Sequence, residues 1–163
     1  MGQESWSSAM AEINRLIAGG DDSALVWQFR AKCLANLGQV HSALEACVQS
    51  ISLDSTDKHS HFIHALILAE MKEFSTASEA LKRTLYLDRQ FVEAHYQLGI
   101  IQMRKGDRQA GVKSLQNALR ITQASDPDRQ LHDAAGMTYG RMVAILKNEL
   151  KVYVELTDKE RNA

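Results

Sequence analysis

Proline is almost absent from this chain of 163 residues, and cysteine is scarce. With Pro127 as its one proline, the chain must end its helices with Asp, Ser and Gly residues, and no alternation of polar and apolar residues predicts a strand. Cys33 and Cys47 are too few for the disulfide framework of a small secreted protein, so we expect both thiols to be reduced. The sequence therefore predicts an all-helical protein without disulfide bonds.

Excess charge and long apolar runs are absent as well. The 19 basic and 20 acidic residues give a formal net charge of −1, which leaves no excess of positive charge to attract nucleic acid or anionic lipid. No apolar run approaches the roughly 18 to 20 residues of a membrane span, and the polar start MGQES has neither the basic flank nor the apolar stretch of a signal peptide. We therefore expect a cytoplasmic protein, with no nucleic-acid partner and no membrane insertion.

Residue types recur along the chain at a period of 34. One phase of this period is occupied by Gly38, Lys72 and Gly106. A second phase is occupied by the small residues Ala43, Ala77 and Gly111. Each period contains two apolar stripes at helical spacing, with the first of these phases between them. A period of 34 with small residues at fixed places is typical of the tetratricopeptide repeat, a helical hairpin that buries its apolar face only by stacking on its neighbours.

The expected architecture is a right-handed superhelix of three such hairpins in a single all-α domain of residues 1–163. The hairpins are expected at residues 24–57, 58–91 and 92–125, between an N-terminal helix at 4–18 and a capping helix at 136–156. Small residues should stand where the two helices of a hairpin cross, because they let the backbones approach closely. Gly38 and Gly106 should take the left-handed conformation that ends a helix.

No motif for catalysis or cofactor binding is present: there is no glycine-rich phosphate loop, nucleophile elbow or helical zinc pair with a carboxylate. His61 and His64 lie three residues apart and invite a metal hypothesis. Packing is the stronger interpretation, because His61 and His95 share the phase of Trp27, the place for a large ring between helices. We therefore expect no catalytic residue, cofactor or metal in this chain.

Binding of a protein or peptide is the better candidate, because stacked hairpins expose the inner side of their first helices in one groove. By phase, the groove is expected to be lined by Gln28, Lys32, Asn36, Phe62, Leu66, Glu70, Tyr96, Ile100, Met103 and Arg104. Its middle would be apolar and its rim charged, which suits an amphipathic helix or an extended peptide anchored on Phe62 and Tyr96. The alternative is that these residues support neighbouring helices or are covered by the tail of the chain.

One known type of ligand is disfavoured for this groove. Repeat proteins that hold the tails of chaperones bind a terminal carboxylate with cationic and amide side chains on their first helices. The corresponding positions here hold Gln28, Lys32, Ile63, Glu93 and Gln97. Lys32 is the one cation among them, and Glu93 would repel an anionic terminus, so a co-chaperone of this kind is not expected.

Four segments contain residues that the repeat pattern itself does not require. They read LKRTLYLD at residues 81–88, FVEAHYQLG at 91–99, QNALR at 116–120 and GMTYGRM at 136–142. This pattern resembles the tetratricopeptide region that follows the catalytic domain in some bacterial chemoreceptor glutamate methyltransferases of the CheR family, although Arg89 stands where that region has proline. The resemblance implies a non-catalytic docking or regulatory module in chemotaxis signal transduction. The S-adenosylmethionine-dependent methyl transfer would belong to a domain that this chain lacks.

Three hypotheses therefore stay open. The first is the regulatory module of a chemosensory methyltransferase, whose partner would be a chemoreceptor, another signalling component or its own catalytic domain. The second is a free-standing scaffold or assembly factor built from the same repeats. The third is a metal protein or enzyme in its own right, with a site at His61 and His64.

Overall fold

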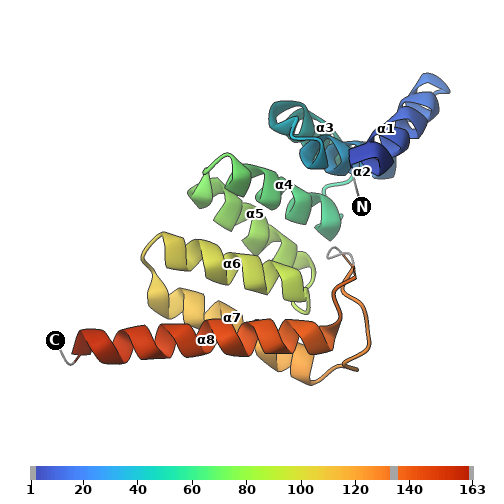
Figure 1. Ribbon diagram of the computed structural model, residues 1–163. Helices are drawn as coiled ribbons and strands as arrows, with labels where there is room; N and C mark the ends of the chain where they lie inside the picture. Colours follow the sequence, from blue (N-terminus) through green and yellow to red (C-terminus); the bar gives the residue numbers. More distant parts are fainter. Residues whose placement is uncertain (1–2, 133–135, 162–163) are drawn as a thin grey trace. The chain divides into compact units, whose positions relative to one another are not determined.

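The computed structural model describes residues 3–132 and 136–161. Its helices, in chain order, are α1 (Gln3–Ala18), α2 (Ala24–Asn36), α3 (Val40–Leu53), α4 (Lys58–Glu70), α5 (Phe74–Leu87), α6 (Val92–Arg104), α7 (Arg108–Gln123) and α8 (Tyr139–Arg161) (Figure 1). No strand occurs in these two ranges, where an isolated bridge between Gln130 and Thr138 is the only β-type pairing. The expected all-α fold class is therefore confirmed. None of the helices within the described ranges is both long enough and apolar enough to cross a bilayer.

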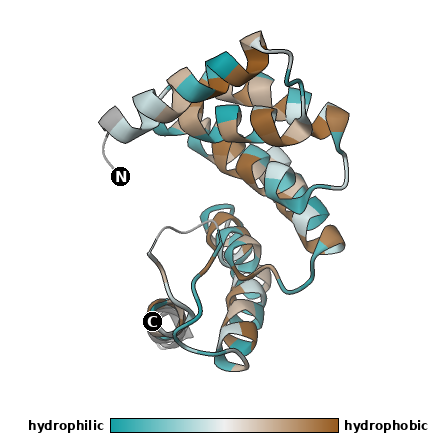
Figure 2. Cartoon of the chain, turned by 90° about the vertical axis from the view of Figure 1, so that its right-hand side faces the viewer, coloured by the Kyte–Doolittle hydropathy of each residue, from teal (hydrophilic) through white to brown (hydrophobic). Residues whose placement is uncertain are grey.

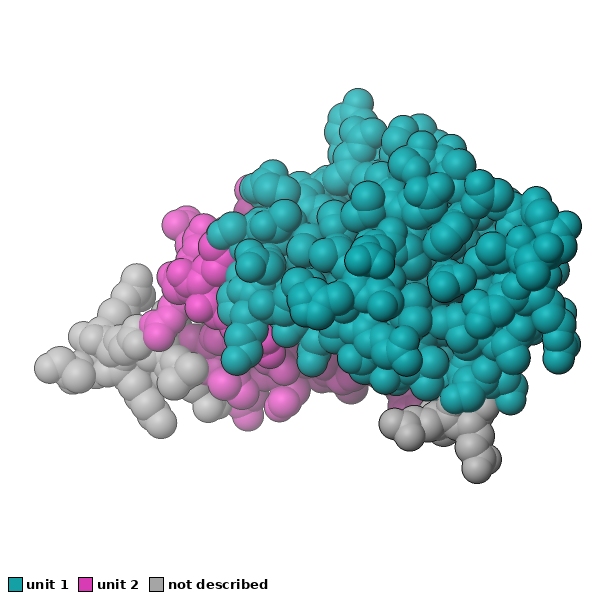
Figure 3. Space-filling view, turned by 90° about the horizontal axis from the view of Figure 1, so that it is seen from above, with its two compact units in different colours: residues 1–87 teal, residues 88–163 magenta. Residues whose placement is uncertain are grey.

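Contacts divide the chain into two units, residues 1–87 and 88–163 (Figure 3). Unit 1 contains the hairpins α2–α3 and α4–α5, with α1 packed on α2 and α3 packed on α4. Unit 2 contains the hairpin α6–α7, with α8 packed along α7. Apolar and polar turns alternate along the helices (Figure 2), as expected for helices that bury one side.

The turns within the hairpins share one backbone conformation. Gly38 and Gly106 have φ values of 77° and 85°, which confirms the left-handed conformation expected for them. Lys72, at the same phase, has a φ of 64° although it carries a side chain. Each of the three residues follows the end of a first helix, so the repeat enforces this conformation whatever residue is present.

The small residues stand where the helices of a hairpin approach each other. A Cβ atom added at Gly99 on α6 would lie 3.1 Å from the carbonyl oxygen of Gly111 on α7, and one added at Gly111 would lie 3.0 Å from the carbonyl oxygen of Gly99. In unit 1, the corresponding residues Ala31, Ala43 and Ala77 are fully buried. The close approach expected from the sequence is therefore confirmed.

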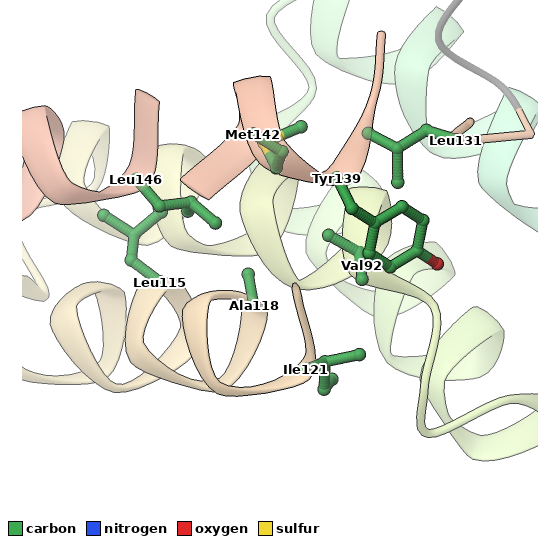
Figure 4. Close-up of a cluster of buried hydrophobic side chains, with 8 residues drawn as sticks. All are labelled: Val92, Leu115, Ala118, Ile121, Leu131, Tyr139, Met142 and Leu146. Atoms are coloured by element: carbon green, nitrogen blue, oxygen red, sulfur yellow. The ribbon is translucent and has the colours of Figure 1, made fainter. Parts of the chain in front are cut away.

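Each unit has its own apolar core. The core of unit 1 includes a cluster formed by Ala31, Leu34, Ala43, Ala46, Cys47, Ile63 and Ile67. The core of unit 2 is formed by Val92, Leu115, Ala118, Ile121, Leu131, Tyr139, Met142 and Leu146 (Figure 4). Three of these last residues lie on α8, so α8 completes the core of unit 2. Cys33 and Cys47 are both free thiols, as expected.

Candidate functional site

Gln28 connects the first two hairpins of unit 1. Its side-chain amide on α2 donates hydrogen bonds to the Asp57 carboxylate and to Ser60 Oγ, the latter over 3.3 Å. Asp57 is the N-cap of α4 and accepts a bond from the backbone N–H of Ser60 at 2.8 Å and another from Ser60 Oγ at 2.6 Å. Gln28, which was expected to line the groove, therefore holds the start of α4 against α2.

A buried polar network continues from this point into α3. Ser50 Oγ lies 2.8 Å from Ser60 Oγ and donates to the carbonyl oxygen of Ala24 at 2.7 Å. Cys47 Sγ lies 3.2 Å from the carbonyl oxygen of Ser60, and burial, followed by the nearby charge of Asp57, raises the pKa of this thiol to about 12. The network was not foreseen. Its signal in the sequence is a set of short polar residues at phases where other repeats place apolar ones.

The remaining groove candidates of unit 1 divide into one interior residue and four at the surface. Phe62 is 2% exposed, so its ring belongs to the interior. Lys32 and Leu66 are half-buried, whereas Asn36 and Glu70 are exposed. Helical periodicity turns these four residues about 100° or more away from the buried Ala31 and Leu34 of α2 and Ala65 of α4, and we call them the α2–α4 face. Asn36 Nδ2 donates to the carbonyl oxygen of Lys32 at 2.8 Å, which orders the end of α2.

Two exposed apolar residues of α2 were missed by the phases that defined the groove. Leu25 is 59% exposed and Phe29 is 48% exposed. With Lys32 and Asn36 they recur at intervals of four, three and four residues, which places all four on one side of α2. Extending the stripe from Lys32 toward the start of the helix would have found them.

In unit 2, three of the four groove candidates pack against the apolar core of that unit, which α8 completes. Tyr96, Ile100 and Met103 on α6 pack against the cluster that α8 completes. Burial raises the pKa of Tyr96, and the charges of Glu149 and Tyr153 on α8 raise it further, whereas Arg104 lowers it. Met103 lies over Gly111, where the side chain would be only 2.8 Å from an added Cβ atom, so it belongs to the crossing of α6 and α7. Arg104 is exposed at the end of α6.

Trp27, His61 and His95 occupy the same phase of the repeat. Each ring forms a hydrogen bond with the turn that precedes its helix. His61 Nε2 lies 3.0 Å from the carbonyl oxygen of Ser55, and His95 Nε2 lies 3.1 Å from the carbonyl oxygen of Arg89, in each case six residues earlier. The Trp27 indole N–H instead donates to a side chain, the carboxylate of Asp22, which lies five residues earlier. Within residues 5–132 and 136–153, no three His, Cys, Asp or Glu side chains come together as metal ligands would.

Comparisons with known proteins agree with this geometry. Residues 92–125 match the tetratricopeptide repeat family model, and no curated protein matches the chain. The type III secretion translocator chaperone SycD of Yersinia enterocolitica is similar in structure, with a TM-score of 0.73, 12% identity and coverage of 84% of this chain and 96% of that one.

Two other solved structures are similar in the same sense. YrrB, described as a tetratricopeptide-repeat (TPR) protein with an unusual peptide-binding site, has a TM-score of 0.66 and 20% identity. The match covers 78% of this chain and 64% of YrrB. The second TPR of Spaghetti, bound to an HSP90 peptide, has a TM-score of 0.60 and 14% identity over 63% of this chain and 95% of its own. At such identities the likeness concerns the fold alone. Residues 92–125 are therefore a tetratricopeptide repeat, and the chain has the all-helical fold of tetratricopeptide-repeat proteins.

Proposed function

We propose that this chain is a non-catalytic protein-interaction module and that it binds a protein partner on the α2–α4 face. The observation that carries the proposal is the composition of that face. One apolar side chain, Leu66, shares this face with Lys32, Asn36 and Glu70 on two helices that contact each other. An apolar anchor with a polar rim is the usual composition of a surface that binds an amphipathic helix or an extended peptide.

The construction of unit 1 supports this assignment. The hydrogen bonds of Gln28 and Asp57 fix α4 against α2, so the face is ordered before a partner arrives. A preformed surface loses less conformational entropy on binding than a mobile one. The proposed site is limited to unit 1, because Tyr96 and Ile100 of unit 2 contact the cluster that α8 completes.

The similar structures support a binding role without identifying the partner. YrrB is described by a peptide-binding site, Spaghetti was solved with a peptide bound and SycD is described as a chaperone. The HSP90 peptide of Spaghetti is not the ligand that we propose here. Lys32 is the one cation among the positions at which such proteins hold a terminal carboxylate, and Glu93 at another of them is buried and acidic.

A narrower proposal rests on the four segments that resemble the CheR-family methyltransferases. If this chain is their docking module, its reading frame in the bacterial genome should continue upstream into an α/β methyltransferase domain, and its partner should belong to the chemoreceptor complex. A free-standing scaffold or assembly factor is the alternative, and its reading frame should begin near Met1. Sequencing of the gene upstream separates the two.

The binding site can be tested without a known partner. Peptides selected on the full chain from a random phage-displayed library should lose at least about tenfold in affinity for Leu66→Glu, because a charge replaces the proposed anchor. Val48→Glu is the control, since Val48 is 51% exposed on α3, away from the face. Titration by fluorescence anisotropy gives both affinities. Peptides that bind Leu66→Glu as tightly as the original chain would contradict the proposed site.

A further inference from the structure

Helix α1 has the phase of a second helix of the repeat. The residues that follow one another here at intervals of 34 are Ile13, Cys47, Leu81 and Leu115. The last three are fully buried on α3, α5 and α7, and Ile13 is 7% exposed. The side of α1 that carries Ile13 is therefore the side that a second helix buries.

The repeat supports α1 on one side only. By contrast, α3 packs on α2 of its own hairpin and on α4, and α7 packs on α6 and on α8. Within residues 3–132 and 136–161, α2 is the one helix on which α1 packs extensively. A second helix that lacks the first helix of its own hairpin is held by fewer contacts than α3 or α7.

The contact between α1 and α2 has a small buried centre. It consists of Ile13 of α1 with Val26 and Cys33 of α2, and Ile13 is the only buried residue among positions 5–18. At its rim, Arg30 Nη1 donates to Asn14 Oδ1 at 3.2 Å. The other apolar side chains of α1 in this contact are partly exposed: Trp6, Ala9, Met10 and Ile17. A local opening costs the contacts that it breaks, so α1 should detach at a lower free energy than unit 1 unfolds.

The joint after α1 is suited to act as a hinge. Gly19 and Gly20 directly follow α1, and the N–H of Gly20 donates to the carbonyl oxygen of Ile17 at 3.0 Å. Gly20 has a φ of 93°, in the region that glycine enters without strain. A few residues at the end of an element suffice to absorb the backbone rotation of a hinge. Rotation at this joint would move α1 as a body and leave α2 in place.

We propose that α1 is a hinged lid on α2, which swings away at Gly19–Gly20 while the remainder of unit 1 stays folded. Opening uncovers Val26 and Cys33, which have the phases of Ser60 and Ile67 on α4. On α4 that side packs against α3. The closed lid thus caps the side on which a first helix stacks, and the open lid exposes it.

The two cysteines report lid opening and unfolding separately. Cys33 lies in the contact with α1, whereas Cys47 is fully buried in the larger cluster of unit 1. N-ethylmaleimide labels exposed thiols, and mass spectrometry of the digested chain gives a labelling rate for each cysteine. In the full wild-type chain, Cys33 should react at least about tenfold faster than Cys47, because opening of the lid suffices for it. Equal rates would overturn the proposal.

Two variants separate the lid from the rest of the unit. Ile13→Ala removes the buried contact of the lid and should speed the labelling of Cys33 at least about tenfold. Leu81 on α5 is packed alike whether the lid is closed or open, so Leu81→Ala should speed the labelling of Cys47 at least about tenfold and that of Cys33 less than about twofold. If Leu81→Ala speeds both thiols equally, then global unfolding exposes Cys33 and the lid is rejected.

Hydrogen exchange of the wild-type chain checks that α1 itself moves. The amides of residues 9–16 should exchange with the opening constant that Cys33 reports, and those of α4 with the smaller constant that Cys47 reports. Exchange in α1 as slow as in α4 would contradict the proposal. Leu66→Glu should leave the labelling of Cys33 unchanged, so this result is independent of the proposed partner-binding site.

Discussion

The first hairpin of unit 1 and the hairpin of unit 2 fill three repeat phases with different kinds of residue. At three phases that are two periods apart, unit 1 has Gln28, Cys47 and Ser50, whereas unit 2 has Tyr96, Leu115 and Ala118. In unit 1 these residues join a hydrogen-bonded network where α2, α3 and α4 meet, and Cys47 packs in the apolar cluster of that unit as well. In unit 2 they pack in or against an apolar cluster that α8 completes. The period thus determines where helices meet, and the residue type determines what holds them together.

This difference has energetic consequences. A buried polar network requires that every group keeps its partner, because an unpaired buried donor or acceptor costs about 1 to 3 kcal/mol. Among the described residues, every buried side-chain nitrogen and oxygen has a hydrogen-bond partner. An apolar cluster is limited mainly by volume, because a deleted side chain leaves a cavity. The two units should therefore respond differently to truncation at the same phase.

The largest difference is expected at the phase of Cys47 and Leu115. Leu115→Ala should lower the free energy of unfolding by about 2 to 5 kcal/mol, because Leu115 is fully buried in the cluster that α8 completes. Cys47→Ala should lower it by only about 1 kcal/mol, since a single sulfur atom is lost together with a weak hydrogen bond. Urea denaturation followed by circular dichroism measures both. Equal losses would contradict the expected difference between the two hairpins at this phase.

Much of the fold could be predicted from the sequence because its determinants are local. The spacing of apolar residues predicts the helices, and steric exclusion predicts small residues such as Gly99 and Gly111 where helices cross. The conformation of Gly38 and Gly106 follows from the same local reasoning.

The candidate site is less accessible to such reasoning, because exposure depends on which neighbouring element covers a helix. The phase of Phe62 does not reveal that it is buried, and the phase of Tyr96 does not reveal that Glu149 and Tyr153 of α8 lie close to it. Gln28 likewise has a partner, Asp57, that only the packing of α4 on α2 defines. The site as a whole stays a prediction.

A smaller effect should distinguish the three turns that follow the first helices. Lys72→Gly should raise the free energy of unfolding by about 0.5 to 1 kcal/mol, because glycine takes a φ of 64° without the strain that a side chain brings. Gly106→Lys is the reverse change at the same phase, and should lower it by about 1 kcal/mol. An added Cβ atom at Gly106 meets nothing within 4 Å, so this variant reports backbone strain alone. Urea denaturation gives the free energy of unfolding of both variants. A loss of stability in Lys72→Gly would contradict the proposed backbone strain at Lys72.

The smallest effect is a dependence of stability on pH from one histidine in each unit. Burial lowers the pKa of His64, with His61 adding to the shift, and burial also lowers the pKa of His95 despite its bond to the Arg89 carbonyl. The unfolded chain therefore binds protons at these rings more readily than the folded protein. Their contribution to stability is unchanged at high pH and falls as the pH drops from about 7 through the ordinary histidine pKa of about 6.5.

Replacement of these rings should remove that part of the slope. His64→Gln in unit 1 and His95→Gln in unit 2 should each flatten the fall in unfolding free energy between about pH 7 and pH 5.5, by less than about 1 kcal/mol because both rings are half-buried and partly screened. Urea titrations at each pH measure the slope. If both variants keep the full slope of the original chain, then burial of these two rings is not the cause of the fall in stability.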